Sequence, residues 1–159
     1  MAMTLSGTTG IVEPAAAAPA FSAYQSSSQT ISGATFTKIQ CNVEEFDTNS
    51  NYDNATNYRF TPTVAGYYQV SGNVSYNPTA TPVSITLTSI FKNGARFKDG
   101  SFSNINSAQG GWSAVSCLMY FNGTTDYAEL FSYMAGPATL TTQNSFPYTY
   151  FQAAMVRSA

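Results

Sequence analysis

The sequence contains no histidine and has few charged residues. Six Lys or Arg and eight Asp or Glu make up 9% of its 159 residues and give a formal net charge of −2, whereas a typical soluble domain has about 25% charged residues. Without histidine, the chain cannot form a His-containing catalytic triad, a Cys2His2 zinc site or a facial iron triad. We therefore expect that the protein is not an enzyme.

Basic residues are too scarce for a nucleic-acid partner. The only local group of them is Lys92, Arg96 and Lys98, and binding to a phosphate backbone needs many clustered basic side chains. We expect no nucleic-acid partner.

Long apolar runs are absent as well. No stretch reaches the roughly 18 apolar residues of a membrane-spanning helix, so we expect no membrane insertion. Residues 1–12 contain no Lys or Arg and no apolar run of about seven residues, which are the marks of a secretory signal. The sequence thus predicts synthesis in the cytoplasm without such a signal.

Hydrophobic residues make up 43% of the chain and aromatic residues 14%, enough for one folded domain with its own core. Polarity comes mainly from uncharged Ser, Thr, Asn and Gln. The two cysteines, Cys41 and Cys117, are too few for a disulfide scaffold. We expect two buried free thiols, with a single bridge as the alternative.

The chain divides into a tail, residues 1–20, and a domain, residues 21–159. In the tail, Pro14 and Pro19 bracket four alanines. Two prolines so close together favour an extended spacer over a helix. We expect this tail to anchor the protein to a larger assembly.

From Phe21 onward, the pattern is that of an all-β protein. Apolar and polar residues alternate through residues 83–92, and Asn93-Gly94 then supplies the two positive φ angles of a tight hairpin. Asn122-Gly123 joins the strand-like runs 112–121 and 127–134 in the same way. The sequence predicts a β-sandwich or jelly roll.

Several predicted strands are apolar on both faces. In residues 114–121, Val115, Cys117, Met119 and Phe121 form one face, and Leu118 lies on the other with Ala114 and Tyr120. One face can line the sandwich, but the second needs a cover, because soluble monomers rarely expose large apolar patches. We expect a contact between subunits.

The spacing of aromatic residues and glycines resembles the globular head of complement C1q, a member of the tumour-necrosis-factor superfamily. Phe60, Gly66, Tyr68 and Val70 carry the strongest part of the resemblance, within residues 59–70. The resemblance extends from residue 21 to residue 157.

The resemblance implies a jelly roll of about ten strands that assembles as a homotrimer, with the termini at one end and the loops at the other. It also implies a set of residues for the core or the trimer contact: Phe36, Phe60, Gly66, Tyr68, Val70, Met119, Phe121, Phe131, Tyr133 and Phe151.

Only one cluster of carboxylates occurs, formed by Glu44, Glu45 and Asp47, with Asp53 nearby. We expect a solvated acidic loop and no cofactor. The alternative is a calcium site that uses Asp47 and Asp53, which would need six to eight oxygen ligands. Of the glycosylation sequons at Asn54, Asn73 and Asn122, the one at Asn73 falls within a predicted strand, where a glycan does not fit.

Aromatic residues in predicted loops are candidates for surface recognition. Aromatic platforms surrounded by neutral hydrogen-bonding groups suit sugars, and residues 101–107 have this composition. The alternative is that these rings only anchor their loops. The candidates are Tyr52, Tyr58, Phe97, Phe102 and Trp112.

Together, the low charge, the missing signal and the Ala/Pro tail favour a bacteriophage fibre or capsid-decoration protein. Such a virion protein would be assembled in the bacterial cytoplasm, with residues 1–20 bound to a capsid or tail protein. Its trimeric head would attach to a host-surface glycan or receptor. The alternatives are a secreted ligand of the C1q/TNF type and a bacterial surface or spore-coat glycoprotein domain.

Overall fold

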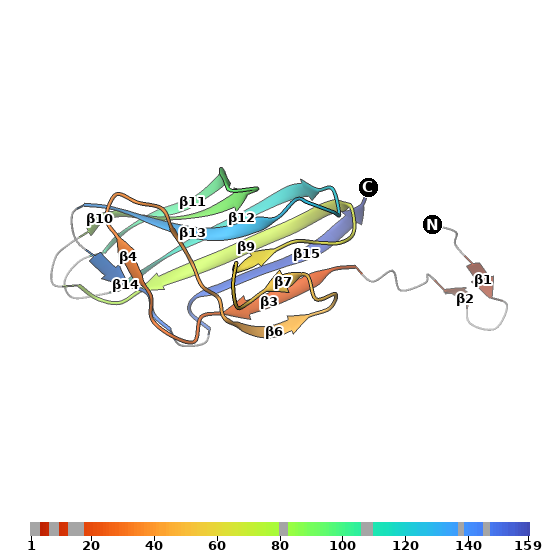
Figure 1. The fold of residues 1–159 in the computed structure, drawn as a ribbon, viewed down its shortest axis with the longest axis horizontal. Coiled ribbons are helices and arrows are strands. Elements are labelled where there is room, and N and C mark those ends of the chain that lie inside the picture. Colours follow the sequence, from red (N-terminus) through yellow and green to blue (C-terminus); the bar gives the residue numbers. More distant parts are fainter. Residues whose placement is uncertain are drawn as a thin grey trace.

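The computed structural model describes residues 4–6, 10–12, 18–79, 83–105, 110–136, 139–144 and 147–159. All regular structure in these ranges is β-strand, and two sheets face each other as a sandwich (Figure 1). No helix in the described ranges is long and apolar enough to cross a membrane.

The larger sheet has six strands in the order β11-β10-β13-β8-β7, with β5 also paired to β13. The strands of this sheet are β5 (Thr37–Lys38), β7 (Tyr52–Asp53), β8 (Arg59–Phe60), β10 (Val83–Lys92), β11 (Ala95–Ile105) and β13 (Ala128–Ala135).

The second sheet has five strands in the order β12-β9-β15-β3-β6, and all its neighbours are antiparallel. Its strands are β3 (Ala20–Tyr24), β6 (Val43–Asp47), β9 (Gly66–Tyr76), β12 (Gly111–Phe121) and β15 (Tyr150–Ser158). Two small pairs complete the set: β1 (Thr4–Ser6) with β2 (Gly10–Val12), and β4 (Thr30–Ser32) with β14 (Thr139–Thr141).

The predicted all-β jelly roll is confirmed. The expectation was about ten strands, and the two facing sheets hold six and five, because β5, β7 and β8 are separate two-residue strands. Within the expected tail, the antiparallel pair β1 and β2 was not predicted. Residues 13–17 of the Ala/Pro spacer lie outside the described residues.

The core lies between the sheets and includes a cluster of aromatic rings. Phe21 of β3 stacks on Tyr52 at 4.5 Å and on Phe60 at 4.6 Å between ring centroids. Phe121 meets Phe60 edge to face at 5.9 Å. Such pairs add about 0.5–1.5 kcal/mol each beyond their burial, so these rings hold the two sheets together.

The alternation predicted for residues 114–121 is confirmed in β12. Val115, Cys117, Met119 and Phe121 are buried, whereas Leu118 and its neighbours on the same face are exposed. The strand therefore has one face in the core and one apolar face outside it.

The first predicted hairpin is also confirmed. Asn93 and Gly94 have φ angles of 53° and 76°, and Lys92 of β10 pairs with Ala95 of β11 around them. Two positive φ angles match the twist of the flanking strands.

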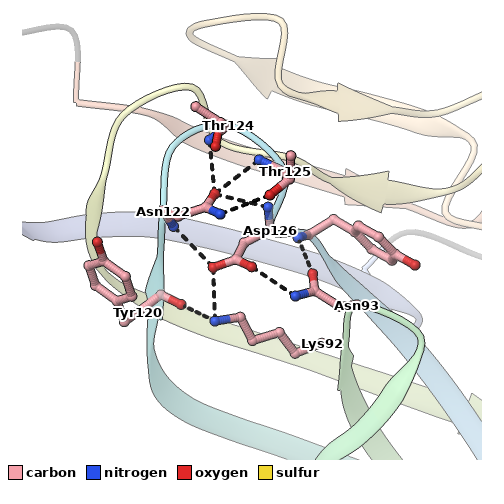
Figure 2. A network of polar contacts seen from close by, with 8 residues as sticks. Lys92, Asn93, Tyr120, Asn122, Thr124, Thr125 and Asp126 are labelled. Carbon is pink, nitrogen blue, oxygen red and sulfur yellow. Dashed lines mark hydrogen bonds and ion pairs between the residues drawn. The ribbon is translucent and has the colours of Figure 1, made fainter.

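The second Asn-Gly pair does not form a hairpin, so that prediction is wrong. β12 belongs to the five-stranded sheet and β13 to the six-stranded sheet, so residues 122–127 cross from one sheet to the other. Asn122 Oδ1 accepts hydrogen bonds from the backbone amides of Thr124, Thr125 and Asp126 at 2.9–3.0 Å (Figure 2). The asparagine thus stabilises a crossover turn.

Asp126 ties this crossover to the hairpin at Asn93 (Figure 2). Its carboxylate lies 3.0 Å from Lys92 Nζ and accepts from Asn93 Nδ2 at 2.8 Å. Burial opposes ionisation of Asp126, but the hydrogen bonds from Asn93, Lys92 and the Asn122 amide outweigh it and hold its pKa below the usual range.

Along one side, serine side chains join the two sheets. Ser113 Oγ of β12 donates to the Ser101 carbonyl of β11 at 2.6 Å and accepts from the Thr88 amide of β10 at 2.9 Å. The Ala114 amide donates to Ser101 Oγ at 3.2 Å. Backbone groups of β10, β11 and β12 are satisfied in this way, although no ladder of backbone hydrogen bonds pairs β11 with β12.

β3 begins and β15 ends at the same end of the sandwich, while β4 and β14 lie at the opposite end (Figure 1). We call the first the terminal end and the second the distal end. The tail therefore joins the domain at the terminal end, as the resemblance implied.

Candidate binding surfaces

Most residues expected in the core or the trimer contact lie inside the sandwich. Tyr68 is fully buried, and its hydroxyl donates to the Val64 carbonyl at 2.7 Å. Gly66 begins β9, where a Cβ would lie 2.4 Å from the Arg157 carbonyl oxygen. The others that are buried are Phe60, Val70, Met119, Phe121 and Phe151.

Phe36, Phe131 and Tyr133 are only half-buried. Residues 131 and 133 occupy the face of β13 opposite to the buried Leu130 and Met134, because successive side chains of a strand alternate. Phe36 lies 5.1 Å from Tyr133 between ring centroids. These rings are therefore outside the central core.

Tyr52 is a wrong candidate for surface recognition. It is buried, and its hydroxyl donates to the Cys41 carbonyl at 2.9 Å. Its ring stacks on Phe21, so no external ligand can reach it. Tyr58 is half-buried and has a φ of 50°.

The other three aromatic candidates are exposed, and all of them lie on strands, Trp112 at the start of the predicted strand-like run 112–121. Phe97 and Phe102 belong to β11 and are 41% and 67% exposed. Trp112 belongs to β12 and is 69% exposed.

The predicted acidic loop is a strand. Glu44, Glu45 and Asp47 lie in β6 at the edge of the five-stranded sheet, and Ser22 Oγ donates to Glu45 at 2.6 Å. Asp47 accepts from the Tyr52 amide at 2.7 Å. No group of three His, Cys, Asp or Glu in the described ranges could hold a metal ion.

Asp53, the other residue of the calcium alternative, caps a turn. Its carboxylate accepts from the amides of Thr56, Ala55 and Asn57 at 2.9–3.1 Å and from Asn57 Nδ2 at 2.7 Å. The backbone hydrogen bonds from Thr56 and Ala55 are the largest cause of its pKa being lowered to about 2.

This lowered pKa predicts an acid-dependent loss of stability. The ionised Asp53 stabilises the fold fully above its ordinary pKa of 3.8, and this contribution is lost as the pH falls from about 4 to about 2. We expect the melting temperature of Asp53→Asn to be lower than that of the wild type at pH 5, with a smaller gap at pH 2. Glu44→Gln, at an exposed position of β6, serves as the control. An unchanged gap at pH 2 would contradict the assignment.

Both cysteines are buried and free, as predicted. Burial raises the pKa of each thiol, which keeps both protonated and unreactive near neutral pH.

An apolar patch lies on the outer face of the five-stranded sheet at the terminal end. We call Tyr67, Leu118, Tyr120 and Val156 the terminal patch; their exposed fractions run from 42% to 57%. The rings of Tyr67 and Tyr120 are 5.5 Å apart. A hollow of about 570 Å³ lies against Tyr67, Leu118 and the C-terminal residues 157–159.

A second hollow lies on the same sheet at the distal end. We call it the distal groove; its volume is about 450 Å³. Trp112 and Tyr148 contribute exposed rings, and Tyr148 is 50% exposed. Its other lining residues are Ser75, Tyr76, Pro78, Gly110, Gly111 and Gln143.

Sequence reasoning found Trp112 but missed Tyr148 and Gln143. Residues 110–112 are far along the chain from Gln143 and Tyr148. Only the pairing of β12 with β9 (Trp112 with Ser75) and the hydrogen bonds between residues 75 and 143 bring them together. A local pattern could not reveal this proximity.

Comparison with solved structures identifies the fold. The globular domain of zebrafish complement 1qA matches with a TM-score of 0.61 at 11% identity, over 89% of this chain and 99% of that one. Eiger TNF from S. frugiperda matches with a TM-score of 0.65 at 8% identity, over 89% and 93%.

The chain has the C1q/TNF jelly-roll fold. Murine APRIL adds a third match, with a TM-score of 0.63 at 8% identity over 87% of this chain and 99% of that one. No family model matches the sequence, and no curated protein matches it. This C1q/TNF-like domain thus shares a backbone architecture with these proteins at very low sequence identity.

Proposed function

We propose that this C1q/TNF-like domain is the trimeric head of a bacteriophage fibre or capsid-decoration protein, which attaches to the host surface and is not an enzyme. The observation that carries the proposal is the terminal patch. It exposes two tyrosines, a leucine and a valine on one sheet face, and such a patch is typical of a subunit interface. The resemblance to C1q heads favours three copies.

The arrangement of the two ends fits an attachment role. The tail joins the domain at the terminal end (Figure 1). The distal groove is lined by residues at the end of β9 and the start of β12, at the other end. A tail bound to a capsid or tail protein would therefore leave the distal groove pointing away from the virion. The low charge and the Ala/Pro composition of residues 14–20 support this reading.

A secreted ligand of the C1q/TNF type is the second candidate, and the similarity to complement 1qA and to a TNF protein favours it. A bacterial surface or spore-coat glycoprotein domain is the third. The neighbouring genes discriminate among them: capsid or tail genes favour the virion protein, and a secretion or exosporium locus contradicts it.

Deletion of the tail tests the proposal directly. We expect a variant that lacks residues 1–19 to remain a folded trimer, because β3 begins at Ala20 and the hydrophobic core of the described residues starts at Phe21. The variant should no longer join phage particles when it replaces the full chain during infection. Normal incorporation of the truncated head would place the anchor elsewhere and overturn the proposed role of the tail.

A further inference from the structure

We propose that the distal groove binds an uncharged glycan, with Trp112 and Tyr148 as its aromatic platform. The inference deepens the proposed attachment function and rests on it. The groove combines exposed rings, neutral polar groups and a lining without charged side chains, and each of these features restricts which ligands can bind.

The rings supply the apolar contact. Trp112 is 69% exposed and Tyr148 50% exposed, although both are large side chains that gain from burial. The negative face of an aromatic ring attracts the weakly positive C–H groups on one side of a sugar ring. With about 450 Å³, the groove is within the roughly 300–1,000 Å³ of small-molecule sites.

The polar groups are held in place before any ligand arrives. Ser75 Oγ donates to Gln143 Oε1 at 2.8 Å, and the Gln143 amide donates to the Ser75 carbonyl at 2.8 Å. The carbonyl of Tyr148 accepts from Asn73 Nδ2 at 2.5 Å. Gln143 Nε2 makes no hydrogen bond to another described residue, so it can donate to a sugar hydroxyl.

The groove has a backbone floor, because Gly110 lies against Tyr76. A Cβ at position 110 would lie 2.2 Å from the Tyr76 carbonyl oxygen, far closer than real contacts allow. The end of β9 at Tyr76 is held in turn by an antiparallel β-bridge to Thr142. The Asn77 amide also donates to the Thr141 carbonyl at 2.9 Å. A rigid floor of this kind loses little entropy when a ligand binds.

The lack of charged side chains in the lining of the groove favours a neutral ligand over an anionic one. Residues 60–91, 100–125 and 130–156 contain no Asp, Glu, Lys or Arg, and every lining residue of the groove falls within these ranges. A sialic acid, uronic acid or phosphate group would find no cation to pair with and would lose its hydration. A neutral sugar, by contrast, needs only the amides and hydroxyls that the groove offers.

The fluorescence of the single tryptophan of the chain can report ligand binding in the groove. Because Trp112 lines the groove, all tryptophan emission of the full-length protein reports on this site. A glycan array that displays each neutral glycan beside its sialylated or uronic-acid counterpart first identifies the neutral oligosaccharides that bind. On titration with these oligosaccharides, we expect a saturable change in the tryptophan emission. The charged counterparts should bind at least about tenfold more weakly.

Variants assign the binding to the groove. On the array, Trp112→Ala and Tyr148→Ala should each lower the affinity about tenfold, Trp112→Phe should restore part of it, and Phe102→Ala should leave it unchanged. Phe102, another recognition candidate from the sequence, is exposed to nearly the same extent, at 67%, but does not line the groove, so this variant separates recognition in the groove from recognition elsewhere. Unchanged melting temperatures would show that the folds are intact.

The inference is overturned if no neutral glycan binds, if charged glycans bind better, or if Phe102→Ala weakens binding as much as Trp112→Ala. It is also overturned if Trp112→Ala lowers the molar mass of the assembly, because the groove would then be a contact between copies. Each of these results leaves the trimer and the tail-mediated attachment to be judged by their own experiments.

Discussion

Phe151→Asp is expected to prevent folding. Phe151 is 1% exposed and lies 5.1 Å from Phe21 and 6.0 Å from Tyr52 between ring centroids. Loss of a buried phenylalanine costs about 3–5 kcal/mol, and an unpaired buried charge costs several kcal/mol more. A domain has only about 5–15 kcal/mol of net stability, so the variant should lack the β-sheet circular dichroism and the cooperative melting of the wild type.

Gln152→Asp is the matched control for this prediction. It places the same new side chain one residue further along β15, where the position is exposed on the other face of the strand. We expect a change within about 0.5 kcal/mol, as for other surface positions. A soluble Phe151→Asp with the melting curve of the wild type would mean that the two faces of β15 are assigned the wrong way round.

Leu118→Asp should separate the proposed trimer into folded single chains. Leu118 is 55% exposed in the isolated chain, so the aspartate costs the monomer little. In a trimer it would place three unpaired charges in apolar contacts, at several kcal/mol each. Light scattering should give about three times 17.0 kDa for the wild type and about 17.0 kDa for the variant, with β-sheet circular dichroism retained in both.

Ser27→Asp serves as the control for the assembly, because Ser27 is exposed between β3 and β4 and far along the chain from the terminal patch. It should keep the mass of the wild type. A wild-type chain that is monomeric at micromolar concentration would contradict the trimer. A trimeric Leu118→Asp would place the interface on another surface.

The sequence predicted the strands best where local chemistry decides them. Asn93-Gly94 forms the expected hairpin because only the two residues of the turn and their φ angles are involved. Alternation along β12 correctly separated Met119 and Phe121 from Leu118, since the side-chain period of a strand is fixed by its backbone.

The errors arose where a distant segment decides the outcome. Asn122-Gly123 looks like Asn93-Gly94, yet the strands around it pair in different sheets, and the choice of sheet depends on β9 and β10, not on the turn. The sequence around Tyr52 is typical of a loop, but the Phe21 ring stacks on the Tyr52 ring and the Cys41 carbonyl accepts a hydrogen bond from its hydroxyl. Burial is set by what packs against a residue, which its neighbours in sequence do not reveal.

By itself, the sequence determined that this chain is an all-β domain of low charge whose strands carry more apolar surface than one core needs. Composition and period-two alternation are properties of the chain and need no partner segment. Only the tertiary structure decided that β12 and β13 belong to opposite sheets, that serines join β11 to β12, and that Trp112, Tyr148 and Gln143 share one groove. These features depend on long-range pairing, because contacts between residues far apart in the chain exist only once both sheets have formed.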